Sequence, residues 1–66
     1  MQRTTFPGST ALSGASYEED RQELTVTFKS GRGYTYHQVP PDVWEQLQSA
    51  DSPGTFWRES IKDAYS

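Results

Sequence analysis

Two tyrosines separated by one residue follow a glycine-containing turn that carries two cations. The stretch reads KSGRGYTY, so Lys29 and Arg32 come shortly before Tyr34 and Tyr36. Aromatic side chains two apart on a strand can stack successive nucleic-acid bases. Backbone N–H groups of a turn flanked by cations can in addition cradle a phosphate. The same composition is also typical of a plain, soluble hairpin turn without a ligand.

The length of the hairpin loop decides which way the two tyrosines face. A three-residue loop that ends with Gly31 in a left-handed conformation pairs Tyr34 with Val26 and Tyr36 with Leu24. Both rings then join the core face, and only their hydroxyls reach its edge. A two-residue loop instead turns both rings to the opposite face of the sheet. The glycine favours the first register, and we expect both tyrosines in the core.

The C-terminal region adds further cations at helical spacing. Arg58 and Lys62 lie four residues apart and could extend a basic stripe towards Arg32. Glu59 and Asp63 are interleaved with them, a pattern that is more typical of a solvated charged face.

Phe56 and Trp57 are adjacent, so on a helix their side chains point about 100° apart. In so small a domain we do not expect both to be fully buried. We therefore predict that one of them lines a groove or a subunit contact, and we take the pair as a candidate interaction surface.

The side chains that catalysis or metal binding would need are scarce. His37 is the single histidine and there is no cysteine, which excludes disulfides and thiolate metal sites. His37 is expected to face away from the tyrosines at a strand end, without the partner and pocket that a general base requires. No G-x-S-x-G nucleophile motif is present. We therefore expect no enzymatic activity, no cofactor and no metal site.

The elements that position these residues predict an α+β fold. Leu24, Val26 and Phe28 alternate with threonines, the period-two pattern of a half-buried strand. Pro41 suits the first position of a helix, where its missing N–H would have no partner in any case. Ser52 is a candidate cap for a second helix. We predict a small antiparallel three-stranded meander followed by two short helices packed on one face.

The expected strands cover residues 11–17, 23–28 and 33–39, and the expected helices cover 40–50 and 55–65. Residues 1–8 are expected to form an irregular N-terminal arm, because Pro7 and Gly8 interrupt it. The whole chain, 1–66, is expected to be a single domain.

The overall composition limits the range of functions. With 66 residues and a net charge of −3, the chain is expected to form a small acidic domain. The acidic total argues against strong nonspecific binding to nucleic acid, but it does not exclude a local basic patch. No apolar run approaches the roughly 20 residues needed to cross a bilayer, and the N-terminus lacks the apolar segment of a signal peptide. We expect no membrane partner and a cytoplasmic location.

The order of these features resembles the KTSC domain, which is named after a C-terminal extension of some lysyl-tRNA synthetases and also occurs as small standalone bacterial and phage proteins. The resemblance covers roughly residues 9–65. It is carried by the following residues together with the IKDAY ending: Tyr17, Val26, Phe28, Gly31, Tyr34, Tyr36, Val39, Pro40 and Phe56. Attachment of the domain to a tRNA-charging enzyme implies RNA as a ligand.

From the residues and the resemblance together we predict a non-enzymatic binding module for RNA or a nucleotide. The predicted ligand-binding residues are Lys29, Arg32, Tyr34, Tyr36 and Arg58. The alternative is a protein–protein interaction module or homo-oligomer that uses Phe56 and Trp57. A phage-type protein that sequesters a nucleotide signal between subunits would combine the two.

Overall fold

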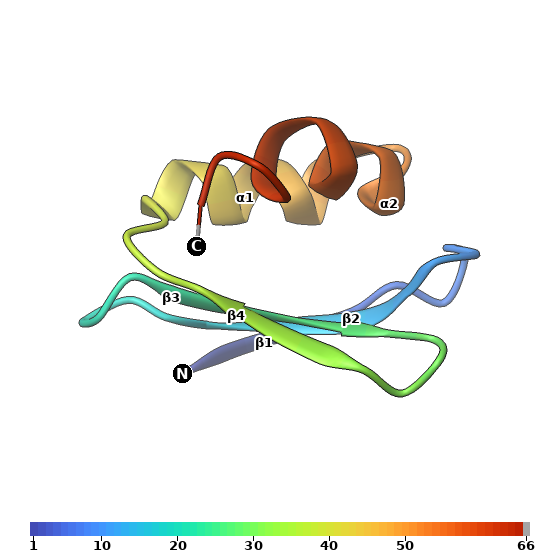
Figure 1. Cartoon of the computed structure of the whole chain (residues 1–66), viewed down its shortest axis with the longest axis horizontal. Coiled ribbons are helices and arrows are strands. Elements are labelled where there is room, and N and C mark those ends of the chain that lie inside the picture. Colours follow the sequence, from blue (N-terminus) through green and yellow to red (C-terminus); the bar gives the residue numbers. More distant parts are fainter. Residues whose placement is uncertain (66) are drawn as a thin grey trace.

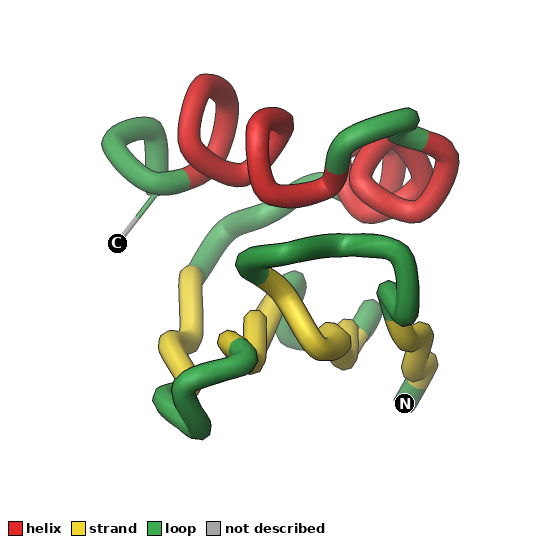
Figure 2. Tube along the Cα trace, turned by 90° about the vertical axis from the view of Figure 1, so that its right-hand side faces the viewer, coloured by secondary structure: helices red, strands yellow, loops and turns green. Residues whose placement is uncertain are grey.

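A computed structural model describes residues 1–65 of the chain as an antiparallel sheet with a helical layer on one face (Figure 1). The four strands lie in the order of the chain, and each pairs with the next. They are β1 (Gln2–Thr5), β2 (Leu12–Glu18), β3 (Glu23–Phe28) and β4 (Gly33–Tyr36). The helical layer consists of α1 (Pro41–Ser49), α2 (Pro53–Phe56) and a wide turn, η1 (Trp57–Ile61), and the second view shows it stacked above the strands (Figure 2). The α+β class is as predicted.

The sheet has four strands rather than the predicted three, because part of the expected irregular arm is β1. Gln2–Thr5 pairs with β2 from Gln2↔Tyr17 to Thr5↔Gly14. The strand is polar and lacks apolar alternation, so it carries no period-two signal in the sequence. Its place depends on tertiary fit: a Cβ at Gly14 would lie 2.8 Å from the Thr4 carbonyl oxygen, so only glycine allows this approach.

The hairpin between β3 and β4 has the predicted register. Val26 pairs with Tyr34 and Leu24 with Tyr36, and Gly31 has a positive φ of 97°. The Phe28 N–H donates to the Arg32 carbonyl at 2.7 Å, which closes a loop of three residues between them. The sequence therefore predicts this turn correctly from its glycine alone.

The two tyrosines nevertheless have different environments, and the prediction that both are core is wrong for Tyr34. Tyr36 is 8% exposed, whereas Tyr34 is 46% exposed. Both point to the face that the helices cover, but β4 is an edge strand and Tyr34 lies near its hairpin end. The Tyr36 hydroxyl contacts the indole of Trp57 in the helical layer, whereas Tyr34 packs against Phe28 of the neighbouring strand.

The helices bury an apolar stripe against the sheet. Helix α1 begins at Pro41 as predicted, and its Trp44 and Leu47 are buried. The second helix begins at Pro53 with Ser52 in the predicted cap position, two residues before the expected range 55–65, although the Ser52 side chain makes no capping bond. It does not remain α-helical: the Lys62 N–H donates to the Trp57 carbonyl at 2.8 Å, an i→i+5 bond that widens the turn.

The core lies between the two layers. Phe28, Val43, Phe56, Trp57 and Tyr65 are partly buried against it. The fully enclosed side chains come from β2, β3, the segment after β4, and the helices: Leu12, Tyr17, Leu24, Val26, Val39, Trp44, Leu47 and Ile61.

Candidate functional site

The hairpin tip, residues 29–32, holds two of the predicted cations on a turn fixed by backbone hydrogen bonds. Lys29 and Arg32 are exposed. The Gly31 N–H donates to the Phe28 carbonyl at 2.9 Å, and the Lys29 N–H donates to the Ala11 carbonyl at 2.9 Å. The second bond ties the tip to the segment that precedes β2. The two charges are therefore presented by an anchored backbone.

Three aromatic rings run from the tip into the helical layer, and we call Tyr34, Phe28 and Trp57 the aromatic row. The Phe28 and Tyr34 centroids are 5.5 Å apart, with ring planes at 79°. The Phe28 and Trp57 centroids are 4.8 Å apart, with planes at 76°. Edge-to-face packing of this kind fixes ring orientations and adds about 0.5–1.5 kcal/mol per pair. Tyr34 is thus a supported ring with close to half its surface in solvent.

Tyr36 is buried and orients a residue of the aromatic row, and it does not offer its ring to a ligand. Its buried ring cannot stack a base, and its hydroxyl oxygen accepts the indole N–H of Trp57 at 3.0 Å. This bond orients the indole at the end of the aromatic row. Of the predicted pair of tyrosines, therefore, Tyr34 alone offers its ring to a ligand.

Phe56 and Trp57, the predicted interaction surface, are both partly buried against the core of their own chain. Lys62 lies over the indole of Trp57, with Nζ 5.9 Å from the ring centroid. This distance falls within the range of a cation–π contact. Trp57 also lines a surface hollow.

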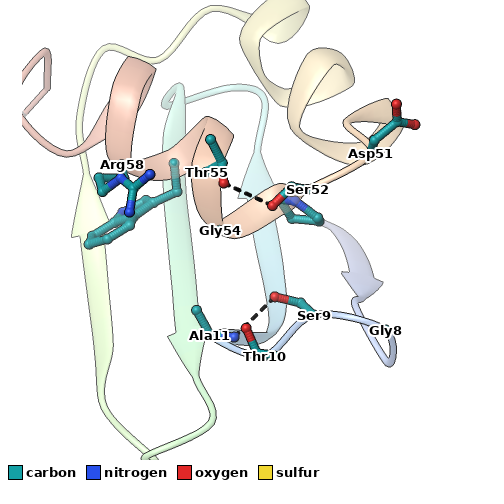
Figure 3. Close-up of a pocket in the computed structure, with 11 residues that line it drawn as sticks. Gly8, Ser9, Thr10, Ala11, Asp51, Ser52, Gly54, Thr55 and Arg58 are labelled. Atoms are coloured by element: carbon teal, nitrogen blue, oxygen red, sulfur yellow. Dashed lines mark hydrogen bonds between the residues drawn. The ribbon is translucent and has the colours of Figure 1, made fainter.

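The hollow has a volume of about 300 Å³ and lies between two segments far apart in the sequence (Figure 3). Residues 8–11, before β2, form one wall, and residues 51–55, around the start of α2, form the other. Arg58, another predicted ligand residue, lines it together with Trp57. Ala11 belongs to the hollow and accepts the hydrogen bond from Lys29, so the hollow adjoins the hairpin tip.

Sequence reasoning missed Phe28, Lys62 and the hollow as parts of this region. In the sequence, Phe28 has the pattern of a core residue, and Lys62 has the pattern of a charge on a solvated helix face. The hollow has no local signal at all, because it arises from the contact between the segment before β2 and the start of α2. Four of the five predicted ligand residues belong to this region: Lys29 and Arg32 lie on the hairpin tip, Tyr34 in the aromatic row and Arg58 at the hollow.

The opposite end of the sheet is acidic. Its carboxylates flank the turn between β2 and β3: Glu18, Glu19, Asp20 and Glu23. His37 also lies there, with Nδ1 3.4 Å from a carboxylate oxygen of Glu23. The histidine therefore lies just past the end of β4 that is opposite the hairpin tip. No helix within residues 1–65 has the length and apolar character needed to cross a membrane.

Comparison with known proteins finds one matching domain family, several relatives in sequence and a similar solved structure. The KTSC domain profile matches residues 8–65. A lysine–tRNA ligase from Nostoc punctiforme is 39% identical over 59 residues, which is 89% of this chain but only 10% of the ligase. A protein from Tsukamurella paurometabola is 35% identical over 57 residues, 86% of this chain and 85% of that protein. The crystal structure of a KTSC domain protein from Yersinia pestis superposes with a TM-score of 0.91 at 28% identity, covering 98% of this chain and 90% of that one.

Proposed function

The chain belongs to the KTSC domain family, and we propose that it is a non-enzymatic module that binds single-stranded RNA or a nucleotide at its hairpin tip. The observation that carries the proposal is the exposed ring of Tyr34, packed edge-to-face on Phe28, on the hairpin whose turn presents the exposed cations Lys29 and Arg32. Stacking of a base on such a ring contributes about 1–3 kcal/mol. Cations beside it add attraction for the phosphate of the same nucleotide.

Two further facts support RNA as the ligand class. The lysine–tRNA ligases among the relatives act, by name, on a tRNA, although this chain spans about 10% of their length. In addition, β3 separates the cations of the hairpin tip from the carboxylates of the acidic turn. The net charge of −3 therefore does not describe the surface of the hairpin tip. Exposed rings beside cations are the usual means of holding single strands without reading their sequence.

The test is charge reversal at the tip, with binding measured by fluorescence anisotropy of a labelled single-stranded RNA at low salt. Lys29→Glu combined with Arg32→Glu removes two cations and adds two carboxylates, so we expect affinity to fall by about tenfold or more. Arg21→Glu, which makes half this change of charge, is the control, because Arg21 is also exposed but lies in the acidic turn. Binding by the double variant at the wild-type level, with circular dichroism showing an intact fold, would refute the proposal.

A second pair of variants separates stacking from charge. Tyr34→Ala removes the ring and is expected to weaken binding by about 1–3 kcal/mol, or roughly 5- to 150-fold. Tyr34→Phe keeps the ring and is expected to bind as the wild type does. Light scattering of the same samples reports the mass of the bound and free species, and so tests the homo-oligomer alternative in parallel.

A further inference from the structure

The hollow beside the hairpin tip carries an inference that rests on the proposed function. It adjoins the aromatic row at one place and the hairpin tip at another. Trp57 belongs to both the hollow and the aromatic row, and its ring contacts Phe28 at 4.8 Å between centroids. Ala11 lines the hollow and accepts the backbone hydrogen bond of Lys29 at 2.9 Å. From Tyr34, the aromatic row leads past Phe28 to Trp57 and so to the hollow.

The lining of the hollow has the chemistry of a nucleotide site. Ser9 and Thr10 face it from one wall, and Ser52 and Thr55 from the other (Figure 3). Hydroxyls both donate and accept hydrogen bonds, which suits ribose hydroxyls and phosphate oxygens. Part of this capacity is already used: the Ser52 hydroxyl donates to that of Thr55 at 2.9 Å, and Ser9 accepts the Leu12 N–H at 3.0 Å. These bonds hold the side chains of Ser9, Ser52 and Thr55 in place.

The two ends of the hollow carry opposite charges. Arg58 lies at the end near Thr55, and Asp51 lies at the opposite end with its carboxylate directed away from the segment that carries Ser9 and Thr10 (Figure 3). A guanidinium binds phosphate through paired N–H donors. The indole of Trp57 supplies an aromatic surface beside this cation. The arrangement fits a phosphate at Arg58 with its nucleoside in the hollow.

The size of the hollow limits what it can hold. About 300 Å³ is the lower end of the range of small-molecule sites, enough for one nucleoside-sized group. We propose that the hollow is a second nucleotide subsite, so that the ligand is a single-stranded RNA segment of two or more nucleotides that runs from Tyr34 past Trp57 to Arg58. A mononucleotide would fill one subsite only.

Calorimetry against AMP, the dinucleotide ApA and the tetranucleotide of adenosine tests this inference. Joining two nucleotides makes the second contact intramolecular, so ApA is expected to bind at least about tenfold more tightly than AMP. Arg58→Glu is expected to bring ApA close to the affinity of AMP. Ala11→Leu, which fills the hollow without a change of charge, is expected to do the same. Both positions are exposed, and thermal melting checks that the variants fold.

The possible results separate this inference from the proposed function. If ApA binds no more tightly than AMP and Arg58→Glu has no effect, while Lys29→Glu with Arg32→Glu abolishes binding, the second subsite is refuted and the tip site stands. If the wild-type chain binds none of the three probes nor labelled RNA, both proposals fail. Arg21→Glu is again the control for charge, with unchanged binding expected.

Discussion

Tyr17 joins the sheet to the helical layer through its ring and its hydroxyl. Its ring is 1% exposed and stacks on Trp44 of α1, with centroids 5.5 Å apart and planes at 14°. Its hydroxyl donates to the Val39 carbonyl at 2.5 Å, which fixes the segment that leads from β4 into α1. Trp44 in turn donates its indole N–H to the side-chain oxygen of Gln2 at 2.8 Å. One tyrosine thus helps to hold both edge strands and the first helix.

Removal of the Tyr17 hydroxyl should therefore cost stability. Tyr17→Phe keeps the ring but leaves the Val39 carbonyl without this donor, and we expect the free energy of unfolding to fall by about 1–3 kcal/mol. Urea unfolding followed by tryptophan fluorescence measures the change. Tyr34→Phe is the control, because Tyr34 is largely exposed and its hydroxyl can bond to water. Equal stability of the Tyr17→Phe variant and the wild type would show that the hydroxyl bond contributes nothing.

The same residue predicts an alkaline limit to stability. Burial raises the pKa of Tyr17 above its ordinary value of 10.0, and the negative charges of Glu19 and Asp42 add to this shift. Below pH 10 the phenol is neutral in both the folded and the unfolded state. As the pH rises above 10 the unfolded state loses this proton first, so the free energy of unfolding falls. The fall should be steeper in the wild type than in Tyr17→Phe, and parallel curves from pH 8 to 11.5 would contradict the assignment.

At the scale of elements, the hairpin between β3 and β4 depends on the backbone conformation of one glycine. Gly31 has φ of 97°, and a Cβ built there meets nothing within 4 Å. Gly31→Ala therefore creates no clash, but it forces an L-residue into the left-handed region, and we expect the free energy of unfolding to fall by about 1–2 kcal/mol.

Gly8 is a matched control, because it has equally open space and no φ in that region. Gly8→Ala should leave stability unchanged or raise it by about 0.4–1 kcal/mol. Thermal melting of the two variants compares them directly, and equal losses would show that φ is not the cause.

The elements also show where sequence reasoning succeeds and where it fails. The strand 23–28 and the hairpin register follow from local rules, namely period two and the glycine of a three-residue loop. Helix α1 follows from Pro41 and its apolar stripe. By contrast, β1 is polar, and it forms because Gly14 admits its backbone and Trp44 bonds to Gln2. These are tertiary causes without a local pattern.

The candidate site likewise combines residues that the sequence predicts with features that depend on tertiary structure. Its cations and Tyr34 can be found in the sequence because they share one short hairpin. The different exposure of Tyr34 and Tyr36 cannot, because it depends on how far the helical layer extends over an edge strand. The wide turn at η1, which sets where Trp57 and Lys62 lie, has no signature in the residues 57–61 themselves.

At the scale of the whole molecule, charge is divided between the two ends of the sheet. The acidic turn precedes β3 and the hairpin tip follows it, so six residues of strand, about 20 Å, separate them. The Debye length at physiological ionic strength is about 8 Å, so each end acts on a ligand almost independently of the other. The net charge of −3 is therefore a poor guide to what the basic end attracts.

This separation predicts how RNA binding should depend on salt. If Lys29, Arg32 and Arg58 each neutralise one phosphate, log K should fall with log salt concentration with a slope of about −2 for a single strand. Between 50 and 500 mM NaCl the affinity should then fall by about 100-fold. Anisotropy titrations over this range measure the slope, and Arg58→Glu should reduce its magnitude by about 0.7.

Glu19→Lys is the control for this prediction. It changes the net charge by two units in the acidic turn, at the far end of the sheet, and should leave the slope unaltered. If the far-end variant changed the slope as much as Arg58→Glu does, binding would follow the total charge of the molecule, and a local site at the hairpin tip would be refuted.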